Sequence, residues 1–439
     1  MKVPMTRYPD SPPFVARPST ASFDTIPSQA TCDPQPFAAH ASDDDLESLQ
    51  QLLEDSRIEP DTCEISVANV KNITRREICR RWLEDTKKHW EAGHAWRKTE
   101  DRINSFPNFT APVEDDGFNF QVHFVALFSN KPEAVPLLLV HGWPGSFLEF
   151  LGTLDVLRER YTPANLPFHV IVPSLPGCGY STRPPLDKDS GIEGVAGVMD
   201  KLMLGLGFGG GYIAQGGDMG SLVARVLGVT SEACKAVHLH FAIDALRLKD
   251  VPADSLDQDE QIGPGRCKES NTLGEAHARE HGTRSPTRGL VPPPNPIALL
   301  AWVGEKFLQW SDESPPLDDI LDVVTLCWLT KAFPRPAYPY QRFSSPMPAV
   351  IHLDPKWHID KPMGYSWHFK DIPPVPKVVA KTANLVWYRA HTHGAQLTAM
   401  EKPKLLAKDV EDFARAVRPT IKRGWSESTG PAATHYHGP

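Results

Sequence analysis

Short, strongly apolar runs alternate along the middle of the chain with longer segments whose apolar residues follow a helical spacing. The runs lie at 135–140, 169–172, 211–214 and 236–241, and the helical segments between them at 147–161, 191–206 and 221–228. Runs that are apolar at nearly every position suit strands buried on both faces. Their alternation with helices is typical of a parallel sheet covered on each side. We therefore expect an α/β fold.

The strand rhythm stops near residue 245 and does not resume before residue 364. Between these points the apolar spacing is helical, most clearly at 297–310 and 317–331. Strand patterns then return at 364–369 and 384–391, and a helical pattern follows at 403–417. This interruption predicts a helical lid at 245–345, inserted between strands of one mostly parallel sheet.

The N-terminal part combines an irregular lead with helical segments. Residues 1–35 are rich in Pro, Ser, Thr and Ala without periodicity, which is typical of disorder. Helical spacing follows at 43–53 and 74–91, and a strand pattern at 121–128. The expected organisation is a disordered lead at 1–35, an N-terminal helical meander at 36–111, a first core part at 112–244, the lid at 245–345, a second core part at 346–422 and a disordered tail at 423–439.

Composition and charge narrow the class of partner. The 439 residues include 46 basic and 54 acidic side chains, a net charge of -8, which argues against nucleic acid. No segment approaches the roughly 18 consecutive apolar residues of a membrane span. Seven cysteines without a C-x-x-C pair favour reduced thiols and a cytoplasmic location. We expect a small-molecule partner and no cofactor, and a homodimer is compatible with the sequence.

Asp218 stands in the segment GGDMGS at 216–221, directly after an apolar run and before a helical segment. Glycines on both sides of one polar residue fit a sharp strand-to-helix turn that presents a nucleophile. A carboxylate nucleophile suits displacement at a saturated carbon, such as an epoxide carbon, because the resulting ester is afterwards open to hydrolysis. The plainer interpretation is a turn residue that begins a helix.

Four further motifs accompany this turn: HGWPGS at 141–146, SLPGCGYS at 174–181, DRINSFPNF at 101–109 and NPIALLAW at 295–302. Together, in this order, they resemble the microsomal-type epoxide hydrolases, most nearly the soluble fungal ones. The resemblance covers about 36–417. It implies an α/β-hydrolase core with a mostly parallel sheet, an inserted helical lid and an N-terminal helical meander, acting on a small-molecule epoxide.

The resemblance also implies roles for residues of the core. Asp218 matches the aspartate that attacks the epoxide carbon. The backbone donors that hold the oxyanion of the ester are expected around Trp143 and Met219, with Pro144 shaping the first loop. The family usually has tryptophan where Met219 stands.

Other roles fall on the lid and the later core. Tyr340 matches one of two lid tyrosines that donate hydrogen bonds to the epoxide oxygen, and Tyr338 is its nearby competitor. His277 falls where the second tyrosine belongs. Asp371 matches the acid that orients the catalytic histidine. We expect Tyr338 and His141 to contact the substrate.

The decisive departure is at position 396. Where the family has the histidine that activates water, this chain has Gln396, and an amide does not accept a proton from water near neutral pH. General-base catalysis contributes about 10²- to 10⁴-fold, so an ester on Asp218 should persist. Some epoxide-hydrolase-like proteins of fungal specialised metabolism, alkaloid pathways included, rearrange or cyclise epoxides. The resemblance therefore favours opening without hydrolysis, an epoxide isomerase or cyclase.

Two alternatives stay open. A slow or conventional hydrolase would need a substitute base such as His391 or His393, and a non-catalytic binding protein would form neither adduct nor product. The histidine pairs at 391 and 393 and at 238 and 240 lack a third ligand of suitable spacing, so we expect no metal. A serine esterase is disfavoured because Ser221 lies three residues into the helix.

Overall fold

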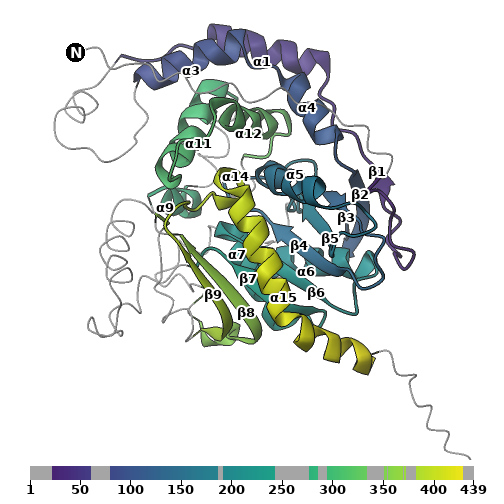
Figure 1. Ribbon diagram of the computed structural model, residues 1–439. Helices are drawn as coiled ribbons and strands as arrows, with labels where there is room; N and C mark the ends of the chain where they lie inside the picture. Colours follow the sequence, from purple (N-terminus) through teal and green to yellow (C-terminus); the bar gives the residue numbers. More distant parts are fainter. Residues whose placement is uncertain are drawn as a thin grey trace, which may run out of the picture.

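A central twisted sheet organises the chain (Figure 1). The computed structural model describes residues 22–60, 80–185, 191–242, 276–284, 294–333, 351–352, 354–368, 370–371 and 382–428. Within these ranges nine strands pair in the order β1-β2-β3-β5-β4-β6-β7-β8-β9. Neighbours from β5 through β9 are parallel, and the pairs from β1 to β5 are antiparallel. The expected α/β class, with a mostly parallel sheet, is confirmed.

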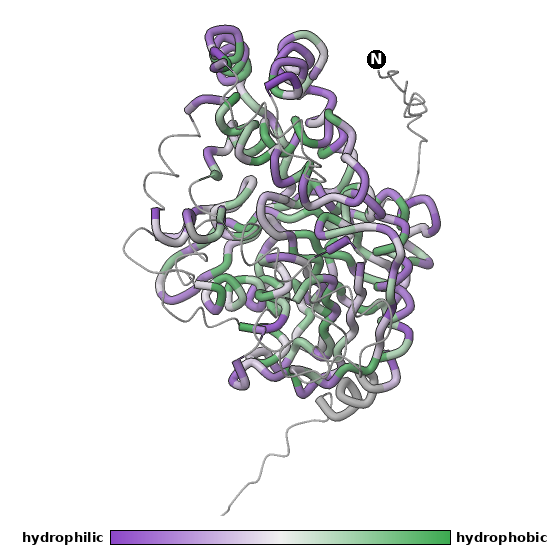
Figure 2. The backbone as a smooth tube through the Cα atoms, turned by 90° about the vertical axis from the view of Figure 1, so that its left-hand side faces the viewer, coloured by the Kyte–Doolittle hydropathy of each residue, from purple (hydrophilic) through white to green (hydrophobic). Residues whose placement is uncertain are grey.

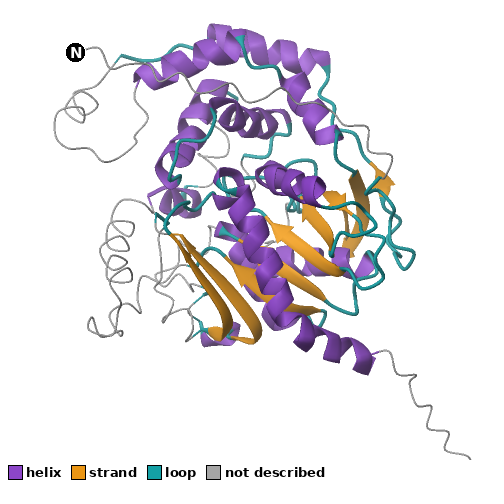
Figure 3. Ribbon diagram, viewed as in Figure 1, coloured by secondary structure: helices purple, strands orange, loops and turns teal. Residues whose placement is uncertain are grey.

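The strands and helices alternate along the core (Figure 3). The strands are β1 Gln35–Pro36, β2 Asn108–Asp115, β3 Phe118–Leu127, β4 Val135–Val140, β5 Phe168–Pro173, β6 Tyr212–Gly216, β7 Cys234–Leu239, β8 Ile359–His368 and β9 Ala383–His391. The α-helices are α1 Asp43–Asp55, α3 Arg80–Ala92, α4 Trp96–Asn104, α5 Leu151–Arg160, α6 Ile192–Gly205, α7 Asp218–Thr230, α9 Ala276–Thr283, α11 Pro296–Trp310, α12 Leu317–Leu329, α14 Thr398–Glu401 and α15 Pro403–Ser428. Short 3₁₀ turns lie at Phe147–Phe150 and Pro355–Trp357.

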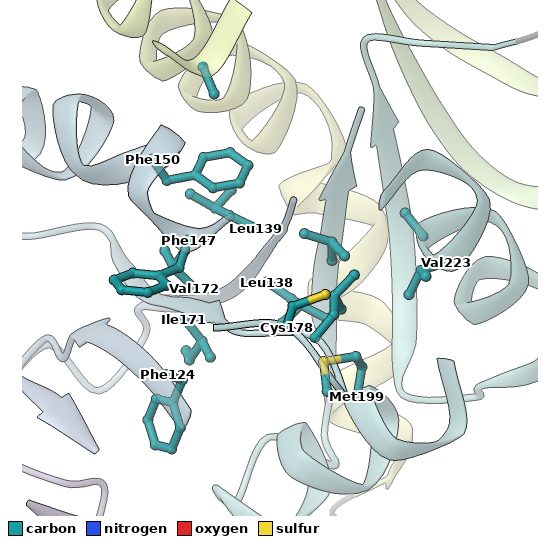
Figure 4. Packing of buried hydrophobic residues seen from close by; sticks show 14 of the residues in the cluster. Phe124, Leu138, Leu139, Phe147, Phe150, Ile171, Val172, Cys178, Met199 and Val223 are labelled. Atoms are coloured by element: carbon teal, nitrogen blue, oxygen red, sulfur yellow. The ribbon is translucent and has the colours of Figure 1, made fainter. Parts of the chain in front are cut away.

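Helices cover both faces of the sheet. Helices α6 and α7 pack together, with α7 against β6, β7 and β8, while α15 packs against α5 and against β7, β8 and β9. Strands β4 and β5 are therefore buried at every position, which explains their unbroken apolar runs. Figure 4 shows part of the resulting core, where Phe147 and Phe150 approach Leu139 and Val172. Apolar positions concentrate in this interior and hydrophilic ones at the periphery (Figure 2).

The lid helices lie above the sheet and contact the N-terminal helices. Helix α11 packs against α12, α1 and α3, and α12 packs against α4 (Figure 1). The N-terminal helices α1, α3 and α4 therefore support the lid helices α11 and α12 by direct contact. None of the helices in the described part of the chain is long and apolar enough to cross a membrane.

Some elements differ from the sequence prediction. Strand β2 was not expected, because Pro112 and its acidic end at 114–115 obscure the apolar alternation. It pairs with β3 through a tight turn at Asp116 and Gly117, both with positive φ, which is the Asp-Gly signature of a two-residue hairpin. Helix α15 continues to Ser428, past the expected end at 417, so the segment taken as a disordered tail begins as helix.

Candidate active site

Asp218 occupies the sharp turn between β6 and α7, as the glycine pattern predicted. Its φ is 45°, in the left-handed region that residues with a side chain rarely adopt. A Cβ atom on Gly216 would lie 2.2 Å from the Gly220 carbonyl oxygen, and one on Gly220 would lie 2.1 Å from the Val140 oxygen. The two glycines therefore allow the close approach of strand and helix that holds Asp218 in this strained conformation.

Three donors hold the Asp218 carboxylate. The backbone N–H of Trp143 donates to Oδ1 at 2.8 Å, and Gln396 Nε2 donates to Oδ2 at 2.7 Å. The backbone N–H of Met219 is the third donor. The two expected oxyanion-loop donors thus both bind the carboxylate, and Gln396 meets it from another chain segment.

Burial of this carboxyl group raises the pKa of Asp218 to about 6, although the three donors oppose the rise. Desolvation disfavours the charged form, and each hydrogen bond to the carboxylate favours it. Asp218 is consequently ionised at neutral pH but loses its charge in mild acid. A second buried acid lies near it: burial first, and then the Asp218 charge, raise the pKa of Glu149 well above its usual range. The sequence pattern did not single out Glu149.

The HGWPGS segment runs close to the nucleophile position. A Cβ atom on Gly142 would lie 2.4 Å from Asp218 Cβ, and the Trp143–Pro144 peptide bond is cis. His141 supports this segment, because its Nε2 accepts from the Leu175 N–H at 3.1 Å and its Nδ1 donates to the Gly142 carbonyl at 3.0 Å. Both ring nitrogens of His141 therefore bind backbone groups; its contact with substrate remains a prediction.

Aromatic and imidazole rings of the lid pack against Trp143 of the HGWPGS segment. His277 on α9 stacks on the Trp143 ring, with centroids 5.5 Å apart and planes at 9°, and the Trp310 ring meets His277 edge-on at 4.9 Å. The His281 ring approaches Trp143 at 4.6 Å, and Trp302 donates to His281 Nε2 at 3.1 Å. His277 thus lies on the lid side of the Asp218 donors.

The later site residues lie at the carboxyl ends of neighbouring parallel strands. Asp371 is buried just beyond β8, and Gln396 is buried in the turn beyond β9. Tyr338 and Tyr340 fall outside the described residues. The two substitute bases considered above lie elsewhere: His391 Nε2 is 2.5 Å from Asp409 Oδ2, and the His393 side chain is 70% exposed.

A buried hydrogen-bond network that reaches the Asp218 backbone was not predicted from the sequence. Arg225 Nε donates to His352 Nδ1 at 2.8 Å, so the imidazole proton is on Nε2. That nitrogen lies 3.0 Å from Ser221 Oγ, which itself donates to the Asp218 carbonyl at 2.5 Å. All donors point towards Asp218, and His352 has no free lone pair to take the Ser221 proton. This pair therefore lacks the arrangement of a serine nucleophile and its base.

Among the described residues no group of three or more His, Cys, Asp or Glu side chains forms a metal site. The turn presents a carboxylate held by hydrogen-bond donors, and imidazole rings of the lid pack on the ring of Trp143, whose N–H is one of those donors. Such a site suits electrostatic stabilisation of positive charge or attack on carbon.

Two family profiles match the chain. Residues 135–298 match the alpha/beta hydrolase fold, and residues 34–150 match the epoxide hydrolase N terminus. The sheet order and the Asp218 turn agree with the first match, so the protein is an α/β hydrolase in fold.

Relatives narrow this class. The structure of Aspergillus niger epoxide hydrolase is similar to the chain with a TM-score of 0.83 and 44% identity, covering 90% of this chain and 100% of that one. A Dothistroma septosporum protein provisionally named an epoxide hydrolase is 40% identical over 397 residues, 89% of this chain and 92% of that protein. Epoxide hydrolase 1 of Sus scrofa is 27% identical over 444 residues, 91% of this chain and 90% of that protein. The chain belongs to the epoxide hydrolase family.

Proposed function

We propose that this enzyme opens an epoxide at Asp218 and releases a rearranged or cyclised product instead of a diol. The hydrogen bond from Gln396 Nε2 to Asp218 Oδ2, 2.7 Å long, carries the proposal. An amide nitrogen donates but has no basic lone pair, so Gln396 holds the carboxylate without activating water. The reaction then keeps the ring opening of the family and lacks its hydrolytic half.

In the proposed reaction an acid protonates the epoxide oxygen while one C–O bond breaks, its electron pair passing to that oxygen. The Asp218 carboxylate stabilises the positive charge that develops on carbon, because its charge is already oriented by fixed donors. A hydride or alkyl group then migrates with its electron pair from the neighbouring carbon, and the hydroxyl returns its proton to the acid as a carbonyl forms. Attack by a nucleophile within the substrate, which loses its own proton, gives the cyclised product. Substrate and product are isomers in both cases.

We assign the acid role to Tyr340 and His277. Tyr340 comes from the resemblance to the family. His277 is supported by its stacking on Trp143, whose N–H binds Asp218, since this places the imidazole on the lid side of the carboxylate. Asp371, without a histidine to orient, is proposed as a residual member of the family site. The similarity to the Aspergillus and Dothistroma proteins supports a fungal setting, and an isomerising step suits specialised metabolism, alkaloid pathways included.

Incubation of the protein with a panel of aryl and alkyl epoxides in ¹⁸O-water tests this function. The expected products are isomers of the substrate that carry no solvent oxygen, identified by mass spectrometry. Rapid formation of labelled diol would show instead that another base replaces histidine. An unchanged substrate with no adduct on the protein would indicate a binding protein.

The rate of epoxide consumption is expected to depend on the charge of Asp218. The ionised carboxylate is the active form of Asp218, and its pKa is about 6. The rate should therefore be maximal at pH 8, half-maximal near pH 6 and roughly tenfold lower for each pH unit below that. Initial rates between pH 4.5 and 8, corrected for the uncatalysed opening in acid, measure this profile. A rate independent of pH down to 4.5 would contradict the role of the Asp218 charge.

A further inference from the structure

Two buried imidazoles lie against the segment 393–397, here called the Gln396 loop. His240 directly follows β7 and His368 ends β8, with ring centroids 6.4 Å apart. Only 3% of His240 and 1% of His368 is exposed. The two rings therefore come from neighbouring parallel strands and reach the loop from inside the protein.

His240 joins the Asp218 turn to the Gln396 loop. Gln215 Nε2 lies 2.7 Å from His240 Nδ1, and because an amide nitrogen only donates, the imidazole proton must be on Nε2. His240 then donates to the backbone of Gln396. The same ring packs against the Asp218 turn, since a Cβ atom on Gly217 would lie 1.9 Å from His240 Nε2. One side chain thus contacts the residue before Asp218 and the residue that binds its carboxylate.

The rest of the Gln396 loop is also fixed. His368 Nδ1 makes a hydrogen bond with the His393 carbonyl at 3.2 Å, and the Gly394 N–H donates to Asp312 Oδ2 at 3.0 Å. Gly394 has a φ of 86°, and a Cβ atom there would lie 2.9 Å from His368 Nδ1. The loop is therefore held at 393 and 394 as well, and the bond from His240 is made to Gln396 itself.

We propose that His240 is a positioning residue that keeps the Gln396 carboxamide directed at Asp218 Oδ2. The proposal rests on the proposed role of Gln396 as a donor, and it adds the residue that determines how that donor is aimed. Burial lowers the pKa of both His240 and His368 to about 3, so both imidazoles stay neutral at working pH. His240 therefore keeps one hydrogen-bonding arrangement and acts through Gln396, not as a base.

Titration of Asp218 tests the proposal without any substrate. With ¹³C-labelled aspartate carboxyls and the Asp218 signal assigned by its loss in D218N, the His240→Leu variant should show the Asp218 pKa raised by about 0.5–1 pH unit, because a misdirected Gln396 no longer stabilises the carboxylate. His240→Gln places an amide donor near the position of Nε2 and should restore the native value. Circular dichroism and thermal unfolding verify that each variant is folded.

His169→Leu is the matched control. His169 is also a buried imidazole whose pKa burial lowers to about 4, but it lies near the start of β5, at the opposite end of the parallel strands. Its loss should leave the Asp218 titration unchanged. If His240→Leu does not fold, Gln215→Leu removes the donor that fixes the His240 ring and should shift the Asp218 pKa in the same direction.

Equal Asp218 pKa values in His240→Leu and His169→Leu, or an equal rise in His240→Leu and His240→Gln, would overturn the proposal. The identity of the epoxide product does not enter this test. Labelled diol from the native protein would contradict the proposed function but not the positioning role of His240. Failure of the function and failure of the positioning role are therefore distinguishable.

Discussion

Gln396→His is expected to turn the protein into a diol-forming hydrolase, with diol production raised about 10²- to 10⁴-fold. The side chain at 396 already lies beside Asp218, with Nε2 and Oδ2 2.7 Å apart, so an imidazole would stand where water must be activated to cleave an ester. Buried Asp371, at the end of the neighbouring strand, is the acid available to orient it. Incorporation of ¹⁸O from water into the diol, followed by mass spectrometry, measures the gain.

Two further variants make this result specific. Gln396→Asn keeps an amide and should form no diol. His393→Gln alters an exposed side chain of the same loop and should behave like the native protein. If Gln396→His produced no more diol than Gln396→Asn, the absence of a base at 396 would not be the reason for the proposed lack of hydrolysis.

Asp218→Ala is expected to reduce formation of the isomeric product by at least about 10²- to 10³-fold. The substitution removes the only negative charge that the Trp143, Met219 and Gln396 donors hold in place, so the developing positive charge loses its main electrostatic stabilisation. Rates of product formation at pH 8, where Asp218 is ionised, give the magnitude. Asp218→Asn should be similarly impaired, because it preserves the shape but not the charge.

Asp360→Ala serves as the control for this loss. Its side chain is 96% exposed, and it lies in β8 near the start of that strand, away from the carboxyl ends that form the site. It should retain native activity. Retention of more than about a tenth of native activity in Asp218→Ala would mean that the aromatic and imidazole groups of the lid stabilise the cation without the carboxylate.

The core strands were predictable because both faces of the sheet are covered. Strands such as β4 must be apolar at every position, and that pattern needs no knowledge of the partner strands. Strand β2 was missed because this antiparallel strand, second from the edge of the sheet, carries polar residues and a proline, although the Asp-Gly pair at 116–117 was a usable hairpin signal. Element ends such as that of α15 depend on tertiary packing more than on local spacing.

The candidate site was predictable only in part. The flanking glycines identify Asp218 in the sequence, and its contact with Gln396 was expected from the family resemblance. The side chains that support the site have no comparable sequence motif. Ser221 contacts His352, which is 131 residues away in the sequence, and Gln215 contacts His240, which is 25 residues away. Buried polar networks join residues that only folding brings together, so no local motif or periodicity predicts them.

The Asp218 carboxylate and the Gln396 amide that donates to it lie 178 residues apart in the sequence, on separate turns at the carboxyl ends of the parallel strands. A substitution at 396 therefore leaves the strained Asp218 turn, its glycines and its backbone donors undisturbed. Histidine and glutamine codons differ only in their third base. If the proposed function holds, a hydrolase with this architecture is one nucleotide change away from a different reaction, and reversion requires only one change as well.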